Sequence, residues 1–147
     1  MTKRQWMMVA ILVLSVGWIP LLFIPTGPKK DAKALVAEMP WPYNAGDPVK
    51  GRDVFQACIA CHTTGEHGQK TVGPSLYRLF ERRAGSQADF AYSRAMKQAG
   101  VPWNAPHLDA FLADPQAAVP GTTMTIPGIK DQKTRINLIA FLKAATS

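Results

Sequence analysis

The longest pattern in the sequence is a run without charged side chains near its N-terminal end. Gln5 to Pro28 spans 24 residues, none of which is Asp, Glu, Lys or Arg. A helix of that length would extend for roughly 36 Å, more than the ~30 Å hydrocarbon core of a bilayer. A cleaved secretory signal would have a shorter apolar region and a small-residue cleavage site, whereas this run ends in prolines. The pattern therefore predicts a transmembrane anchor within residues 1–28.

A proline-rich stretch, residues 29–46, is predicted to connect this anchor to the rest of the chain. Five prolines lie from Pro25 to Pro48 inclusive, which favours an extended and semi-rigid backbone. Asp31 is placed to begin one or two helical turns that reach Met39. Three side chains are too apolar for a simple spacer: Met39, Trp41 and Tyr43. We expect them to pack on the following domain or, alternatively, to dock on a partner.

Residues 47–147 show helical periodicity in three places, separated by loops rich in Gly and Pro. The first predicted helix begins with Asp47 as a capping carboxylate and Pro48 at the first helical position. Two predicted helices cover about residues 48–60 and 104–112, and a third begins at Asp131. No segment alternates like a β-strand for more than four residues. The predicted fold class is all-α, with long ordered loops that need something to pack against.

Composition and charge indicate which classes of binding partner the protein is suited to. The hydrophobic fraction is 47% and the charged fraction 18%, which is enough for a core and argues against wholesale disorder. Residues 46–147 carry twelve Lys or Arg against eight Asp or Glu, a net charge of +4. Such a mildly basic domain suits an acidic protein partner or a membrane surface. There is no basic run with interleaved aromatic residues, so no nucleic-acid partner is predicted.

The candidate chemistry lies in the two cysteines, Cys58 and Cys61, with His62 directly after them. A disulfide between positions three apart would close too small a loop to stabilise much. A redox dithiol normally sits on a strand-to-helix turn of an α/β fold, which is not predicted here. A zinc site would need His67 and His107, which lack the spacing of a zinc finger. Covalent haem attachment remains, because C-x-x-C-H is its signature.

Five further segments follow in order: VGPSLYRLFERRAG (72–85), FAYSRAMKQAGVPW (90–103), LDAFLADP (108–115), VPGTTMTIPGI (119–129) and RINLIAFLKAAT (135–146). Together with C-x-x-C-H they closely resemble the class I cytochrome c family, in its mitochondrial and alphaproteobacterial branch. The resemblance covers about residues 48–146, with no obvious insertion between His62 and Met124. With the uncharged N-terminal run, the chain resembles membrane-anchored cytochromes of the c-y type.

The resemblance implies a class I cytochrome c domain wrapped around one haem c, covalently attached through Cys58 and Cys61. His62 and Met124 would be the iron ligands. The Pro74 carbonyl would bind the outer nitrogen of His62 and fix the ring. Four further residues match positions on the propionate side of the haem: Arg82, Tyr92, Trp103 and Thr122. His67 and His107 are expected to be loop residues without a ligand role.

The resemblance also predicts how the first and last helices of the domain cross. Gly51 and Phe55 would pack against Leu138 and Phe141, and Gly51 would permit the close approach. Phe111 stands where the family usually has Tyr, and Met96 stands where it usually has Asn. Both changes remove hydrogen-bonding groups from the interior, so we expect a drier distal side of the haem.

A third departure concerns the exposed haem edge, where the family commonly carries lysines that steer docking onto acidic partners. Five such positions are neutral in this sequence: Ala57, Thr71, Gln116, Ala117 and Thr123. Lys130 remains, but Asp131 reverses the charge of its neighbour. We expect electrostatic steering to be weak. A membrane tether would compensate by raising the effective concentration of the carrier.

The expected function is one-electron transfer in a membrane-bound respiratory or photosynthetic chain. The resemblance implies a cytochrome bc complex as donor and a terminal oxidase or photosynthetic reaction centre as acceptor, with no small-molecule substrate. Haem catalysis such as peroxidase activity would need an open position on the iron, which Met124 would close. The alternative is a permanently bound cytochrome c subunit of a larger respiratory complex.

The expected location is the bacterial cytoplasmic membrane, with a single pass and the haem domain on the periplasmic side. Charges do not set this orientation, because Lys3 and Arg4 are balanced by Lys29 and Lys30 across the apolar run. The expectation rests instead on the family, in which haem is attached outside the cytoplasmic membrane.

Overall fold

The computed structural model describes residues 31–69 and 71–147. Six α-helices and two 3₁₀ turns follow in order: α2 (Ala32–Ala37), η1 (Tyr43–Ala45), α3 (Pro48–Phe55), η2 (Leu79–Glu81), α4 (Arg94–Ala99), α5 (Ala105–Ala113), α6 (Pro115–Ala118) and α7 (Gln132–Ala145). Within these ranges there is no strand, only an isolated bridge between Arg83 and Pro102. The all-α prediction is confirmed.

The predicted transmembrane helix falls outside the described residues. Within them, no helix is both long enough and apolar enough to cross a bilayer.

Each helix begins at a polar residue whose side chain accepts a backbone hydrogen bond, as expected for N-caps. Asp47 caps α3 through bonds from the amides of Val49 and Lys50, at 2.9 and 3.2 Å. Asp131 caps α7 by accepting from the amide of Thr134 at 2.7 Å. These caps satisfy amides that have no partner inside the helix.

The first helix of the domain is shorter than predicted. The α-helix α3 ends at Phe55, whereas the sequence predicts helix to about Ala60. From there the amides of Gln56, Ala57 and Cys58 each bond the carbonyl three residues earlier. This tighter winding carries the chain out of the helix and into the cysteine segment.

Helix α7 is crossed by α3 at a glycine, as predicted. A Cβ on Gly51 would overlap the backbone carbonyl of Asn137 and would lie 2.7 Å from the Cβ of Phe141. One turn further along, the rings of Phe55 and Phe141 pack with their centroids 5.1 Å apart. The Asn137 side chain also accepts a 2.9 Å bond from the amide of Asp47. The missing side chain of Gly51 therefore allows the two helices to approach closely.

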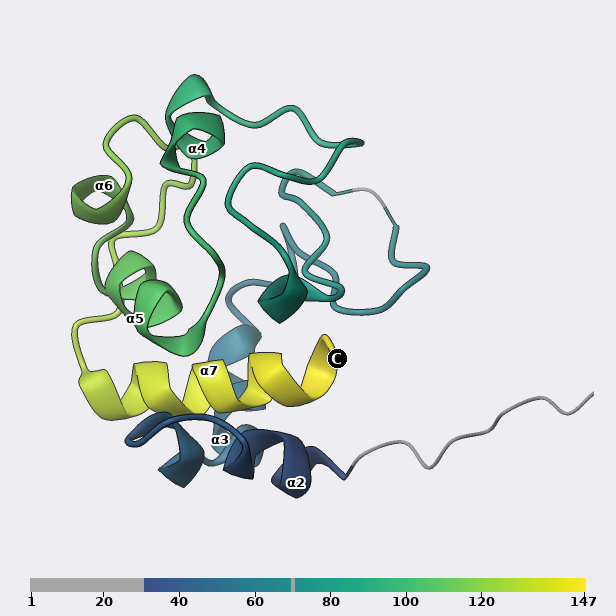
Figure 1. Ribbon diagram of the computed structural model, residues 1–147, viewed down its shortest axis with the longest axis vertical. Coiled ribbons are helices and arrows are strands. Elements are labelled where there is room, and N and C mark those ends of the chain that lie inside the picture. Colours follow the sequence, from purple (N-terminus) through teal and green to yellow (C-terminus); the bar gives the residue numbers. More distant parts are fainter. Residues whose placement is uncertain (1–30, 70) are drawn as a thin grey trace, which may run out of the picture.

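Residues 31–46, here called the N-terminal extension, pack on the domain and do not run free of it. Four of their apolar side chains are buried: Leu35, Val36, Met39 and Tyr43. The predicted helical turns after Asp31 are confirmed as α2, but the extended backbone predicted for this stretch is wrong. The reason is that Val36, Met39 and Tyr43 join the core cluster that includes Ile139 and Ala140 of α7, and burial of apolar surface stabilises this packed arrangement. Figure 1 shows α2 lying along α7, with α5 on the other side.

A buried ion pair holds α7 against α5. Arg135 donates from Nε to the Asp109 carboxylate at 2.6 Å, and its side chain is only 10% exposed. Its Nη1 also donates to the carbonyls of Ile129 and Lys130, at 2.8 and 2.9 Å. Burial and the nearby Asp109 carboxylate raise the pKa of Tyr43, so the extension meets this cluster as well.

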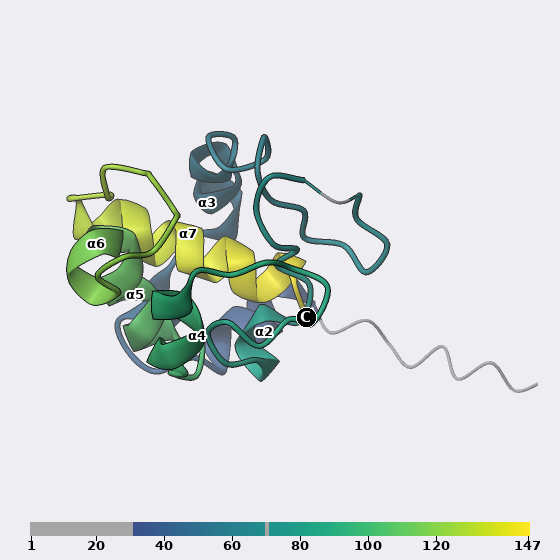
Figure 2. The same ribbon diagram turned by 90° about the horizontal axis from the view of Figure 1, so that it is seen from above.

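The remaining chain forms two walls above α7. Helices α4, α5 and α6 lie on one side, and the long loops of residues 56–69 and 71–92 lie on the other (Figures 1 and 2). Most of the candidate chemistry lies on these loops and on the loop that follows α6. The helices therefore serve as a frame that positions loop residues.

Candidate functional site

The loops and helices enclose a largely apolar pocket, and all nine predicted site residues line it. These are Cys58, Cys61, His62, Pro74, Arg82, Tyr92, Trp103, Thr122 and Met124. The walls between them include Leu79, Leu108, Ile126, Leu138 and Leu142. The structure thus brings His62 and Met124, 62 positions apart in the sequence, to one cavity.

Both cysteines lie at one edge of the pocket because the chain turns tightly between them. The amides of Cys61 and His62 both bond to the Cys58 carbonyl, at 3.0 and 2.9 Å. Both thiols are free, with Cys58 half-buried and Cys61 exposed. Burial, and then the nearby Cys61, raise the pKa of the Cys58 thiol.

The imidazole of His62 is held by Pro74, as predicted. Its Nδ1 lies 2.8 Å from the Pro74 carbonyl, to which the ring nitrogen donates. This bond leaves Nε2 with its lone pair free to bind a metal. The ring also needs Gly73, because a Cβ there would lie 2.6 Å from His62 Cε1 and 2.7 Å from the Cys61 carbonyl oxygen.

Arg82 brings a partly buried positive charge to the pocket, which the exposed Arg83 also lines. It donates from Nη2 to the Ser75 carbonyl at 2.7 Å and from Nη1 to Gln87 Oε1 at 2.5 Å. Burial lowers the pKa of Arg82, but a guanidinium group remains protonated in proteins. Its Nε is buried and has no hydrogen-bond partner in the described part of the chain. A buried donor without an acceptor costs about 1–3 kcal/mol, which points to an acceptor supplied by a bound group.

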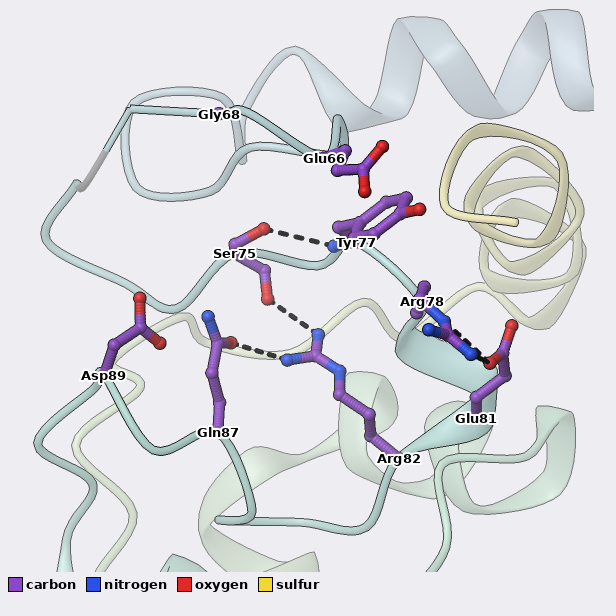
Figure 3. Close-up of a pocket in the computed structure, with 9 residues that line it drawn as sticks. All are labelled: Glu66, Gly68, Ser75, Tyr77, Arg78, Glu81, Arg82, Gln87 and Asp89. Carbon is purple, nitrogen blue, oxygen red and sulfur yellow. Dashed lines mark hydrogen bonds and ion pairs between the residues drawn. The ribbon is translucent and has the colours of Figure 1, made fainter. Parts of the chain in front are cut away.

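The outer face of Arg82 opens into a second cavity of about 350 Å³, which is polar. Figure 3 shows Arg82 between Ser75 and Gln87, with Glu66, Glu81 and Asp89 around the same opening. Arg78 and Glu81 form an exposed ion pair at its rim. Arg82 therefore lies between the apolar pocket and the second, polar cavity.

Tyr92 and Trp103 complete the polar side of the pocket. Burial raises the pKa of the Tyr92 hydroxyl, so it stays a neutral hydrogen-bond donor at physiological pH. The Trp103 ring packs on Phe111 with centroids 5.3 Å apart, and its amide bonds the Arg82 carbonyl at 2.9 Å. Two ring donors and one guanidinium group are suited to holding carboxylates that are largely removed from water.

Met124 is positioned by the loop that follows α6. Its amide donates to Thr122 Oγ1 at 3.3 Å, and the Thr122 carbonyl accepts from Gln116 Nε2 at 2.9 Å. Thr122 is buried, and Gly121 has a φ of +89°, a conformation that favours glycine. Met124 itself packs against a small cluster of buried apolar residues that includes Phe111.

A second thioether in the pocket was not singled out from the sequence as a candidate ligand. Met96, on α4, is buried in the same cluster and also lines the cavity. Sequence reasoning treated Met96 only as a replacement for a polar residue. With Phe111, it makes this side of the pocket apolar, as expected.

The other histidines lie away from the pocket. His67 and His107 are both exposed, but His107 lies in the first turn of α5 and not in a loop as predicted, because the Asn104 cap starts the helix before it. His107 Nδ1 lies 2.9 Å from the Pro102 carbonyl. Within residues 31–69 and 71–147, no three His, Cys, Asp or Glu side chains are grouped as metal ligands. The zinc alternative therefore has no support in the described structure.

Comparison with known proteins decides the family. The cytochrome c family model matches residues 48–146. The chain belongs to the cytochrome c family. Cytochrome c2 of Rhodomicrobium vannielii is 45% identical over 100 residues, covering 68% of this chain and 80% of that protein. Cytochrome c2 of Rhodoblastus acidophilus is 43% identical over 98 residues, covering 67% and 92%.

A solved structure shows the same fold. Cytochrome cH from Methylobacterium extorquens matches with a TM-score of 0.62 and 41% identity, covering 67% of this chain and 98% of that one. Members of the cytochrome c family carry haem c covalently and transfer electrons, and they are not enzymes. The chain is therefore an electron-transfer protein, and Cys58 and Cys61 attach one haem c.

The residues of this cytochrome fit that group. The apolar walls match a porphyrin face, and the two thiols at one edge match its attachment points. The unpartnered Nε of Arg82, which also lines the pocket, could meet an anionic oxygen of that group. Gly73 leaves room for an imidazole where any side chain would collide with it.

Proposed function

We propose that this cytochrome is a membrane-tethered carrier of single electrons. It would take electrons from a cytochrome bc complex and deliver them to a terminal oxidase or a photosynthetic reaction centre. The tether would be one transmembrane helix within residues 1–28, in the bacterial cytoplasmic membrane, with the haem domain on the periplasmic side. The uncharged run from Gln5 to Pro28 supports the tether, and the match to cytochromes c2 supports the carrier role.

Within the site, we assign iron ligation to His62 and Met124. The observation that carries this assignment is their convergence on one pocket, with the His62 ring already oriented by Pro74. When bound, the haem supplies Fe(III)/Fe(II) cycling, for which a His and Met ligand pair favours a high potential. The chain's own residues orient the imidazole, exclude water with apolar walls, and offer Arg82, Tyr92, Trp103 and Thr122 to the haem carboxylates.

The ligand assignment has a competitor inside the pocket, because Met96 also presents a thioether to it. We therefore compare the variants Met124→Ala and Met96→Leu in the purified, oxidised full-length protein. Met124→Ala should lose the Met-to-iron charge-transfer band and become high-spin. Met96→Leu, which conserves volume, should retain the band. The assignment is wrong if the band survives in Met124→Ala and disappears in Met96→Leu.

The membrane role is tested separately. Purification from native membranes without crosslinking should give the protein in the detergent extract, with bound partners identified by mass spectrometry. Carbonate washing should leave it in the membrane, and protease added to spheroplasts should digest the haem domain. Release by carbonate, or protection from protease, would overturn the tether or its orientation.

A second candidate function is a fixed subunit of a larger respiratory complex. The packing of residues 31–46 favours it, because the haem domain then lacks a long flexible linker. Mild detergent discriminates between the two functions, since a free carrier runs alone and a subunit co-purifies with its complex in constant ratio.

A further inference from the structure

Trp41 is an exception to the burial of the N-terminal extension. Its side chain is 81% exposed, although Met39 before it and Tyr43 after it are both buried. Large apolar side chains that face water are few within the described residues, and the others are Val49, Ile59 and Val72. Of these, Val72 lines the mouth of the haem pocket, which already accounts for its exposure.

The backbone on either side of Trp41 is held firmly. Met39 and Tyr43 belong to the main core cluster, together with Ile139 and Ala140 of α7. At Gly46, a Cβ would lie 2.7 Å from both the Cβ of Ala140 and the carbonyl oxygen of Ile136, so the chain touches α7 there. Trp41 is therefore displayed from a fixed position and not from a loose tail.

The distance between the packed extension and the expected anchor is also limited. The uncharged run ends at Pro28 and the packed extension begins at Asp31, three residues later. Three extended residues span at most about 10 Å. A domain tethered this closely to the end of a transmembrane segment has its extension within reach of the bilayer surface.

We propose that the Trp41 side chain inserts into the headgroup region of the bilayer and orients the haem domain on the membrane. This inference rests on the proposed membrane tether. An indole suits this region because its ring is apolar while its N–H can still bond water or lipid oxygens. The short reach of the chain favours lipid over a protein partner as the occupant, since lipid surrounds the end of any tether.

The proposal also predicts how the haem pocket is oriented relative to the bilayer. Leu138 and Leu142 of α7 line the pocket, whereas the Cβ of Ala140 lies against the extension at Gly46. Residues two apart lie on opposite faces of a helix, since each residue turns it by about 100°. Contact through Trp41 would hold α7 between the bilayer and the pocket.

The test uses the four tryptophans of the full-length holoprotein, Trp6, Trp18, Trp41 and Trp103. The protein is labelled with 5-fluorotryptophan and reconstituted in nanodiscs of phosphatidylcholine and phosphatidylglycerol. Each ¹⁹F resonance is assigned by a Trp→Phe variant. The oxidised protein is then exposed either to a lipid with a nitroxide near its headgroup or to a soluble gadolinium chelate.

The Trp41 resonance should be lost with the nitroxide lipid and retained with gadolinium. Trp103, which lines the haem pocket, serves as the internal control and should be unaffected by the nitroxide lipid. The proposal is overturned if gadolinium removes the Trp41 resonance and the lipid does not. It is also overturned if Trp41 becomes protected from gadolinium only on addition of a purified cytochrome bc complex, which would make a protein the occupant.

If the proposed membrane tether is wrong, the same experiment gives a different set of results. Trp6 and Trp18 lie in the proposed transmembrane segment and report on it independently. If the protein does not float with nanodiscs and neither of these resonances responds to the lipid label, the tether is wrong, and the Trp41 contact is overturned with it. If both respond and Trp41 does not, the tether stands and the Trp41 contact alone is refuted.

Discussion

Single residues decide how closely the parts of this cytochrome approach one another. Gly51 allows α3 to cross α7 at backbone contact, and Gly73 lets the chain pass beside the His62 ring. Neither position shows the left-handed backbone that makes glycine necessary in a turn. At both, what matters is the absence of a side chain in a crowded place.

Replacing Gly51 with Ala should therefore destabilise the protein. The new methyl group would meet the backbone of Asn137, which cannot move without shifting α7, and overpacking of this kind costs about 1–3 kcal/mol. The measurement is guanidinium unfolding of the holoprotein followed by haem absorbance. Gly65→Ala is the matched control, because a Cβ at Gly65 has no atom within 4 Å. Equal stability of the two variants would contradict the role given to Gly51.

At the scale of elements, α7 is the helix that contacts most of the other described elements. It contacts the N-terminal extension, α3 and α5, and it contributes Leu138 and Leu142 to the pocket. Asp131 caps the start of α7, and the Arg135–Asp109 ion pair holds α7 against α5. Two predictions concern these two attachments.

The Arg135–Asp109 pair should be strongly coupled. Removing one partner leaves a buried charge uncompensated, so Asp109→Leu and Arg135→Leu should each cost about 3 kcal/mol or more. The double variant should cost less than the sum, with a coupling energy of about 1–3 kcal/mol. The same cycle on Arg78 and Glu81, both more than half exposed, should give a coupling near zero. Similar coupling in both cycles would mean that burial does not matter here.

The Asp131 cap should make α7 sensitive to acid. Bonds from the Thr134 hydroxyl and amide hold the pKa of Asp131 below its ordinary value of 3.8. A depressed pKa means that the carboxylate stabilises the fold above that ordinary value and loses this effect as pH falls through the folded-state pKa. The melting temperatures of Asp131→Ala and the wild type should therefore differ at neutral pH and converge in acid.

Asp131→Asn provides the control for this prediction. Asn also caps helices well but does not titrate in this range. It should stay near wild-type stability at neutral pH and show no loss of capping in acid. A difference between wild type and Asp131→Ala that is independent of pH would show that the charge of Asp131 is not involved.

The sequence was most informative where a capping residue stood before a long periodic segment. The starts of α3, α5 and α7 were predicted because Asp47, Asn104 and Asp131 mark them. Helix α4 was not predicted, because its six residues bury only Met96 and show no periodicity. The packing of the extension was only one of two expectations, since local pattern cannot show which surface would receive Met39 and Tyr43.

The site was predictable to a different degree. The nine predicted site residues came from the resemblance, because its motifs fix their order along the chain, and all nine line the pocket. The second thioether and the neighbours of Arg82 were not found. Met96 reaches the pocket, and Gln87 and Ser75 reach Arg82, only through the folding of irregular loops. No short-range pattern encodes such contacts.

For the whole molecule, the exposed residues that line the pocket carry a single charge, that of Arg83. Ala57 and Thr123 line the mouth and are exposed, and Val72 beside them is 83% exposed. Steering by complementary charge raises association rates by roughly 10- to 1000-fold, but it needs charges at this rim. A carrier confined to the membrane can do without them, since confinement already raises its effective concentration.

Electron transfer should therefore depend weakly on salt. The rate of reduction by a purified cytochrome bc complex, measured by stopped flow on the full chain in detergent, should change by less than about tenfold between low and high ionic strength. The variant Ala57→Lys/Gln116→Lys/Thr123→Lys should react faster at low salt and show a steeper dependence. A steep dependence in the wild type would refute the proposed reliance on tethering.

The position of the extension on α7 sets where this protein can be cut. The family match begins at residue 48, and a fragment trimmed there would look complete by sequence. Trimming would remove Met39 and Tyr43, which pack with Ile139 and Ala140, and would expose an apolar surface of α7 to water. We expect such a fragment to self-associate, whereas one that starts at Asp31 should stay monomeric. A stable fragment should therefore begin at Asp31, directly before α2, and not at residue 48.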